Sequence, residues 1–118
     1  KEKIRNVRYL KISLNIPKTE LDLLIEKRVY EIIENGLINE VKNIILKYGN
    51  NIKPLYSIGY KEIFHYLNKG SSLKDSINKI IINTRRLAKR QMTWLRKDNE
   101  IKWCKDYNEM EEMIKDFI

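Results

Sequence analysis

Hydrophobic and polar residues alternate with a period of two near the start of the chain. Leu10, Ile12 and Leu14 share one face of an extended segment, while the intervening side chains fall on the other face. Pro17 ends the pattern, because its ring fixes the backbone and removes a hydrogen-bond donor. Residues 9–14 are therefore predicted to form a half-buried strand.

Apolar residues then recur at helical spacing in two consecutive segments. Thr19 and Asp22 have the spacing of a capping box, and Gly36 supplies a stop after the stripe that follows. A second stripe runs from Leu37 to Tyr48 and closes in a Gly-Asn-Asn turn. The short connection predicts that these two helices form a hairpin.

Two further helices are expected in the middle of the chain. After Pro54 and a short connecting segment, the third carries one apolar side and ends at Gly70. Ser72 and Asp75 are placed to cap the fourth. This helix is predicted to be the longest, because no Gly or Pro interrupts its apolar stripe before Asp98.

The end of the chain is predicted to form a brief strand at 101–104 and an amphipathic helix at 107–117. Two isolated strands make a marginal ribbon, so both are expected to belong to a larger sheet. The pattern thus predicts about five helices and two short strands, a mainly helical part of an α/β fold.

Composition points to an anionic partner. The chain of 118 residues has 24 Lys plus Arg against 16 Asp plus Glu, a formal charge of +8, which favours nucleic acid. No apolar run is long enough to cross a bilayer. Cys104 and His65 are the sole residues of their types, so neither an intramolecular disulfide nor a paired-cysteine metal site is expected. We expect no metal site, a surface histidine, and a reducing, cytoplasmic setting.

The second half of the fourth predicted helix carries an unmixed run of cations. No acidic residue occurs among them before Asp98, and they comprise Arg85, Arg86, Lys89, Arg90, Arg96 and Lys97. Helical spacing places them opposite the apolar stripe, on a face that is either simply solvated or bound to a polyanion. Gln91, Thr93 and Trp94 lie among them. Trp94 suits either base stacking or core packing, and the spacing leaves both open.

Two further positions are candidates for ligand contact. Arg28 falls within the apolar stripe of the first helix, where a buried guanidinium needs either an internal carboxylate or a bound phosphate. Gly59 stands at the mouth of the third helix, where a glycine allows close approach of an anion or simply makes a turn. These alternatives also remain open.

Together the motifs resemble the tRNA dimethylallyltransferase (isopentenyl diphosphate transferase) family, in the same order along nearly the whole chain. Residues 57–62, Ser-Ile-Gly-Tyr-Lys-Glu, resemble the family's Ile-Gly-Tyr-Lys-Glu motif. Residues 84–96 resemble its Thr-Arg-x-x-Ala-Lys-Arg-Gln-x-Thr-Trp-x-Arg signature. Residues 35–41 are similar to its Gly-Leu-x-x-Glu-Val turn, and Trp103 falls where its closing strand has a tryptophan.

The resemblance implies that the complete enzyme adds a dimethylallyl group to N6 of the adenosine 3′ of the anticodon. Diphosphate would be released in the presence of Mg²⁺, and the partners would be the tRNA anticodon stem-loop and dimethylallyl diphosphate. Arg28 matches a family arginine implicated in catalysis near the diphosphate. The tRNA-contacting positions implied are Tyr56, Ser57, Ile58, Gly59, Tyr60, Lys61, Arg85, Lys89, Arg90, Gln91, Met92, Thr93, Trp94, Leu95 and Arg96.

Departures from the family pattern limit what can be transferred. Leu24 stands where the family has the first arginine of Arg-Ile-x-x-Arg. The P-loop motif Gly-x-x-x-x-Gly-Lys-Ser/Thr does not occur, and the family's N-terminal base aspartate has no counterpart. The first residue is Lys1 and not Met, so we expect an excised piece. The resemblance implies that residues 1–118 are the C-terminal part of a P-loop nucleotide-fold transferase, inactive alone and lacking the Mg²⁺ ligands.

Two other functional classes compete with this interpretation. A free-standing, non-enzymatic RNA-binding module would fold alone and bind stem-loops. A helix-turn-helix DNA-binding protein is disfavoured, because the cations occupy the C-terminal half of a long helix instead of the start of a short recognition helix. If the two strands lack neighbours, exposed apolar surface is expected to cause self-association.

Overall fold

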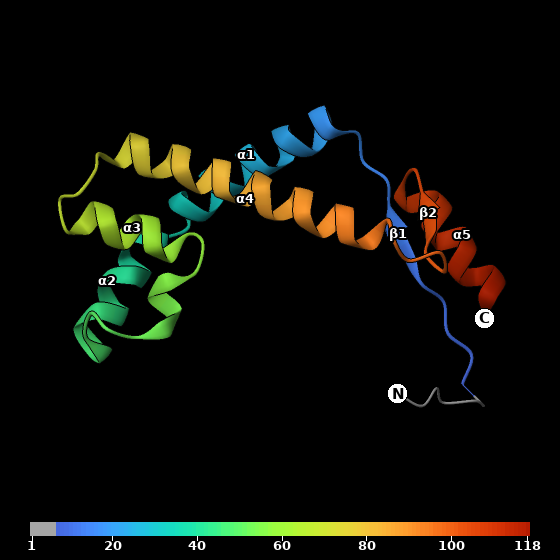
Figure 1. Ribbon diagram of the computed structural model, residues 1–118, viewed down its shortest axis with the longest axis horizontal. Helices are drawn as coiled ribbons and strands as arrows, with labels where there is room; N and C mark the ends of the chain where they lie inside the picture. Colours follow the sequence, from blue (N-terminus) through green and yellow to red (C-terminus); the bar gives the residue numbers. More distant parts are fainter. Residues whose placement is uncertain (1–6) are drawn as a thin grey trace.

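The computed structural model describes residues 7–118 and contains every element that the pattern predicts (Figure 1). In chain order these are β1 (Ile12–Leu14), α1 (Lys18–Glu34), α2 (Leu37–Tyr48), the 3₁₀ helix η1 (Lys53–Tyr56), α3 (Tyr60–Leu67), α4 (Leu73–Leu95), β2 (Lys102–Cys104) and α5 (Tyr107–Phe117). The prediction of five α-helices and two short strands is confirmed for the described residues.

The long helix α4 runs through the middle of the molecule (Figure 1). Helix α3 packs against the first half of α4, α1 crosses α4 near its middle, and α2 packs against α1 and α3, while the strands and α5 lie beyond the C-terminal end of α4. The radius of gyration is 18.8 Å and the extents are 52 × 35 × 24 Å. A compact chain of this length would have a radius of gyration of roughly 13 Å, so the molecule is elongated.

One hydrophobic core holds α1, α2, α3, α4 and η1 together. Its buried members are Val29, Leu37, Val41, Leu55, Ile63, Ile77, Ile80 and Ile81. Leu55 and Ile63 have no exposed surface, and each such side chain contributes about 1.5 to 3 kcal/mol by leaving water. This core fixes α1, α4 and the turn before α3 relative to one another.

The two strands pair with each other in parallel, with Ile12 opposite Lys102 and Leu14 opposite Cys104. Helix α5 packs against both strands. The strand predicted at 9–14 is shorter than expected, because β2 offers only three residues for pairing. The side chain of Lys11 instead bonds Asp98 at 2.9 Å. Membership of a larger sheet stays a prediction.

Most helices begin or end at the residues predicted from the sequence, with two differences. Ser72 Oγ accepts the Asp75 backbone N–H at 3.1 Å, as predicted. The capping box at the start of α1 is wrong: the helix begins at Lys18 after Pro17, with no side-chain cap. Helix α3 ends at Leu67, before Gly70, whose own role is different. A Cβ at Gly70 would collide with the His65 ring, so the glycine makes room for that ring.

Candidate nucleic-acid interface

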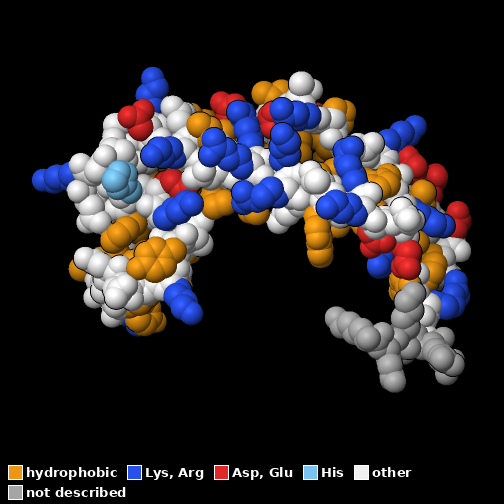
Figure 2. Space-filling view, viewed as in Figure 1, with side chains coloured by type: hydrophobic (Ala, Val, Ile, Leu, Met, Phe, Trp, Pro, Cys, Tyr) orange, Lys and Arg blue, Asp and Glu red, His pale blue; other side chains and the backbone are white. Residues whose placement is uncertain are grey.

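The outer face of α4 presents exposed cations along its second half. Lys and Arg side chains gather along α4 across the middle of the space-filling view (Figure 2). Arg86, Lys89 and Arg90 are exposed and form no ion pair within residues 7–118. Arg96 is also exposed, and its guanidinium lies 5.8 Å from the centre of the Trp103 ring. The predicted outward orientation is confirmed for these four residues.

Arg85 is the exception on this helix. Its Nε lies 3.7 Å from Asp22 Oδ1, and its Nη2 lies 3.5 Å from Glu26 Oε2. Nη2 also donates to the backbone oxygen of Asp22 at 3.3 Å. The prediction of an outward cation is wrong here, because this flank of α4 faces two carboxylates of α1. Arg85 therefore ties α1 to α4.

The side chains interleaved with the cations divide between the two faces of α4. Trp94 is 76% exposed, so the core-packing alternative is wrong and its indole plane is open to solvent. Gln91 is exposed, whereas Met92 and Leu95 are half-buried on the inner side. Thr93 is exposed, and its hydroxyl donates to the Lys89 backbone oxygen at 2.9 Å. At about 100° per residue Trp94 lies about 40° around the helix from Arg90 and about 140° from Lys89, so a ligand beside Arg90 would meet a cation and an aromatic ring together.

A buried carboxylate holds the turn before α3. Gly59 has a φ of 95°, a conformation that disfavours other residues. Its backbone N–H donates to Glu62 Oε1 at 2.8 Å, and the amide of Asn83 on α4 donates to Glu62 Oε2 at 2.6 Å. Glu62 is only 5% exposed. This turn is thus anchored to α4, and the sequence reasoning missed both anchoring residues.

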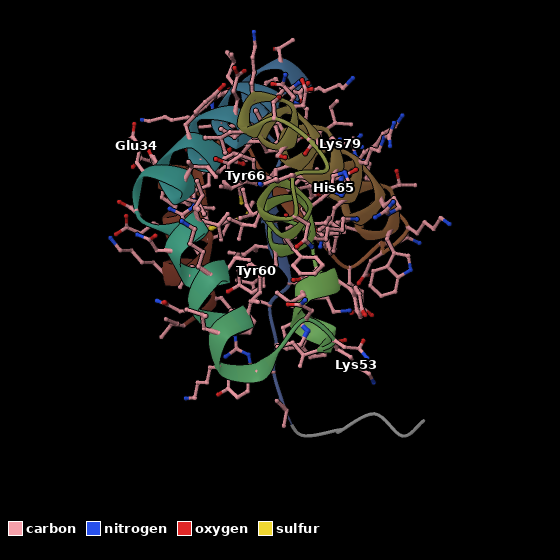
Figure 3. The ribbon with its side chains drawn as sticks, turned by 90° about the vertical axis from the view of Figure 1, so that its left-hand side faces the viewer. Glu34, Lys53, Tyr60, His65, Tyr66 and Lys79 are labelled. Atoms are coloured by element: carbon pink, nitrogen blue, oxygen red, sulfur yellow. The ribbon has the colours of Figure 1, made fainter. Side chains whose placement is uncertain are left out.

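The rest of the 56–61 segment combines packing with exposed groups. The Tyr60 hydroxyl donates to Glu40 Oε1 on α2 at 2.7 Å, and this bond raises the pKa of Tyr60 above its ordinary value. Figure 3 shows Tyr60 in the space beside α2. Ser57 Oγ donates to a backbone oxygen at 2.7 Å. Tyr56 and Lys61 are exposed and available to a ligand, while Ile58 is half-buried.

A cavity of about 520 Å³ brings Arg28 and the Gly59 turn together. Most of its walls are apolar, and its lining comprises Leu24, Ile25, Arg28, Val29, Ile32, Leu37, Glu40, Ile58, Gly59, Tyr60, Ile80 and Thr84. Apolar walls with a few polar groups are typical of small-molecule sites. Two positions that the sequence singled out separately therefore border one cavity.

Arg28 itself is not buried. Its side chain is 70% exposed, and its Nη1 lies 3.7 Å from Glu31 Oε2 one helical turn away. The expectation of a buried guanidinium that demands a partner is wrong, because α1 turns this part of its stripe toward open solvent at the cavity rim. The surface carboxylate is a loose partner, so the guanidinium can reach a ligand.

The side chains that most often bind metals or act as nucleophiles are scattered or buried in the described part of the chain. Residues 7–118 contain no group of three or more His, Cys, Asp or Glu side chains that could hold a metal ion. Cys104 is buried, and burial raises the pKa of its thiol, which disfavours the reactive thiolate. His65 is exposed, as predicted. Among the described helices, none is both long and apolar enough for a bilayer.

Sequence comparison identifies relatives over most of the chain. A sequence model of the IPP transferase family matches residues 1–98. The tRNA dimethylallyltransferase of Halothermothrix orenii is 41% identical over 94% of this chain and 37% of its own length. That of Moorella thermoacetica is 41% identical over 91% of this chain and 34% of its own length. The chain thus spans about a third of these relatives.

Solved structures agree with the sequence relatives. The tRNA isopentenylpyrophosphate transferase of Bacillus halodurans superposes with a TM-score of 0.83 at 31% identity, over 92% of this chain and 37% of that one. The tRNA delta(2)-isopentenylpyrophosphate transferase of Staphylococcus epidermidis gives 0.84 at 28% identity, over 91% and 37% respectively. The resemblance carried by the sequence motifs is confirmed, and the chain belongs to the IPP transferase family.

Proposed function

We propose that the protein containing this chain transfers a dimethylallyl group from dimethylallyl diphosphate to N6 of the adenosine 3′ of the anticodon in tRNA. The observation that carries this proposal is the run of exposed cations along the second half of α4, with no acidic residue among them and with Trp94 exposed beside Arg90. Family membership supports the reaction, since the relatives are named as tRNA dimethylallyltransferases. Within this reaction the chain supplies RNA contacts and one arginine beside the diphosphate.

The RNA contacts would come from exposed cations and from exposed aromatic rings. Lys89, Arg90 and Arg96 offer charge to the phosphate backbone, which supplies most of the affinity of such interfaces. Trp94 and Tyr56 offer exposed aromatic planes on which unpaired bases of a loop can stack. The anticodon stem-loop, which combines a charged stem with unpaired bases, fits this combination.

The target base must leave the stack to react. A stacked adenine cannot bring N6 to a buried electrophile, so the nucleotide has to be extruded into a cavity. The Arg28 cavity, with Gly59 and Tyr60 on one wall and α1 on the other, offers apolar surface of this kind. We assign it to one side of the channel in which the adenine and the prenyl group meet.

Arg28 would stabilise the leaving group. The N6–C1 bond forms as the C1–O bond breaks, the electron pair departs with diphosphate, and N6 loses a proton to a base. Negative charge grows on the diphosphate, and a guanidinium offers it paired charged donors. Its loose contact with Glu31, at 3.7 Å, allows Arg28 to exchange that carboxylate for the diphosphate. Arg28 is therefore our catalytic candidate.

Other parts of the site would lie outside this sequence. No P-loop motif is present in it, and the family's base aspartate has no counterpart. We propose that both belong to an α/β P-loop nucleotide fold that includes β1 and β2, and that Mg²⁺ acts there. No described residue is assigned to the metal. We further propose a cytoplasmic location, where unmodified tRNA is available.

The direct test is product formation by the full-length protein. Purified protein is incubated with unmodified tRNA, dimethylallyl diphosphate and Mg²⁺, the tRNA is digested, and the nucleosides are analysed by mass spectrometry. We expect N6-dimethylallyladenosine at the position 3′ of the anticodon, and none when the diphosphate is omitted. Tight tRNA binding without any prenylated nucleoside would contradict the proposal and favour a non-enzymatic RNA-binding module.

A further inference from the structure

A second, polar pocket of about 370 Å³ lies between α3 and α4, apart from the Arg28 cavity. Lys61 and His65 border it from α3, Lys79 from α4, and Ser71 from the connecting loop. Figure 3 shows His65 and Lys79 next to each other on one side of the molecule. The pocket thus gathers cationic and neutral donors from three segments.

The charge balance of this pocket favours an anion. Lys61 and Lys79 are exposed and form no ion pair within residues 7–118. Glu62 also borders the pocket, but it is 5% exposed, and its two oxygens already accept from Gly59 and Asn83. Two free ammonium groups at the rim therefore outweigh one buried, occupied carboxylate.

The neutral donors are held in place. A Cβ at Gly70 would collide with the His65 ring, so the ring rests directly on the glycine backbone. The hydroxyls of Ser71 and Ser76 lie 2.7 Å apart, and one donates to the other. When Ser76 is the donor of this pair, the Ser71 hydroxyl hydrogen can donate to a ligand. The site is therefore partly organised without one.

Lys79 also continues the basic face of α4 toward its N-terminus. Lys79, Arg86 and Arg90 are spaced seven and four residues apart and all are exposed. At 3.6 residues per turn they fall within about 20° of a single line along the helix, and the rise places Lys79 about 16 Å from Arg90. Figure 2 shows the basic side chains of α4 continuing to the end where the histidine lies. One strand of phosphates can follow this line.

We propose that this pocket binds a backbone phosphate of the RNA whose neighbouring phosphates lie along α4. Lys61 and Lys79 supply the charge, and His65 and Ser71 supply hydrogen bonds. The inference rests on the proposed RNA binding by α4 and extends its contact surface by about 16 Å beyond Arg90. It assigns Lys79 and His65 a role that no sequence motif indicated.

The test compares three single substitutions in the full-length protein. Lys79→Gln removes the proposed contact, and Arg90→Gln removes a contact of the basic face already proposed. Lys74→Gln is the matched control, because Lys74 is exposed on the same helix but about 140° around it from Lys79. Affinity for an anticodon stem-loop RNA is measured by fluorescence anisotropy over a series of salt concentrations.

We expect Lys79→Gln to weaken binding about four- to sixfold near 0.15 M salt and to reduce the slope of log affinity against log salt by about 0.7 to 0.9. Lys79→Arg should retain both values, as should Lys74→Gln. If Arg90→Gln weakens binding and Lys79→Gln does not, the pocket does not bind an RNA phosphate, while the proposed function is unaffected. Wild-type binding by both Lys79→Gln and Arg90→Gln would overturn both.

A free phosphate ion is the remaining alternative source of the same chemistry. Inorganic phosphate at millimolar concentration, with ionic strength held constant, should compete with RNA weakly and equally in wild type and Lys79→Gln if the pocket takes a polymer phosphate. Saturable binding of inorganic phosphate that is lost in Lys79→Gln, with RNA affinity unchanged, would contradict the RNA assignment.

Discussion

The link between Glu62, Gly59 and Asn83 gives the sharpest prediction about local structure. Glu62→Ala removes the acceptor of the Gly59 N–H at 2.8 Å and of the Asn83 amide at 2.6 Å. Hydrogen bonds to a charged group contribute about 1.5 to 3 kcal/mol, and a buried donor left unpaired costs about 1 to 3 kcal/mol. Because the Asn83 amide is partly buried and can reach water, we expect a loss of about 3 kcal/mol in all.

Hydrogen–deuterium exchange of the full-length protein measures this loss where it occurs. The free energy of local opening sets the exchange rate of the Gly59 amide. A loss of about 3 kcal/mol corresponds to exchange faster by about a hundredfold. Glu62→Gln should lie between alanine and wild type, because its amide can still accept from Gly59 if the Asn83 amide rotates to accept in turn.

A matched control separates this effect from a general loss of stability. Glu112 is exposed on α5, and Glu112→Ala should change stability by less than about 0.5 kcal/mol and leave the exchange around Gly59 unaltered. Unchanged exchange in Glu62→Ala would refute the reasoning, since it would mean that the buried carboxylate does not hold the turn.

Three further predictions concern the Arg28 cavity. Arg28→Ala should lower kcat by about 10²-fold or more with little change in tRNA affinity, and Arg28→Lys should recover part of the lost activity. A normal rate of Arg28→Ala in single-turnover assays would show that Arg28 has no role in catalysis. Gly59→Ala places a Cβ at a φ of 95° and should cost about 1 to 2 kcal/mol in thermal or urea unfolding; an unchanged midpoint would contradict it. The hydrogen bond to Glu40 raises the pKa of Tyr60 in the folded state, so it contributes stability below pH 10 that is lost as the pH rises through the folded pKa. Glu40→Gln should bring the pKa of Tyr60, followed by ultraviolet absorbance, back toward its ordinary value.

The helical part of the fold could be predicted because its signals are local. Apolar spacing, Gly36 and the Ser72 cap mark helix bodies and ends within the segment itself, and the structure matches them to within a few residues. Strand length depends on a partner about ninety residues away in sequence, so the extent of β1 could not be read from alternation alone.

The side-chain environment of the site was harder to predict. Helical periodicity gives the face on which a residue lies, but not which neighbouring helix covers that face. Arg28 therefore appeared buried although it is exposed, and Arg85 appeared exposed although α1 covers it with Asp22 and Glu26. The link from Glu62 to Asn83 spans 21 residues and two helices, and only the position of a glutamate three residues after Gly59 hinted at it.

The central claim, that the outer face of α4 binds the tRNA anticodon stem-loop, is tested most directly by charge reversal. Arg90→Glu combined with Arg96→Glu replaces two exposed cations and should reduce affinity by more than tenfold near 0.15 M salt, with a salt slope lower by at least about 1.4. Lys74→Glu, on the other side of the helix, should bind as the wild type does. Wild-type affinity and salt slope in the double variant would contradict the claim.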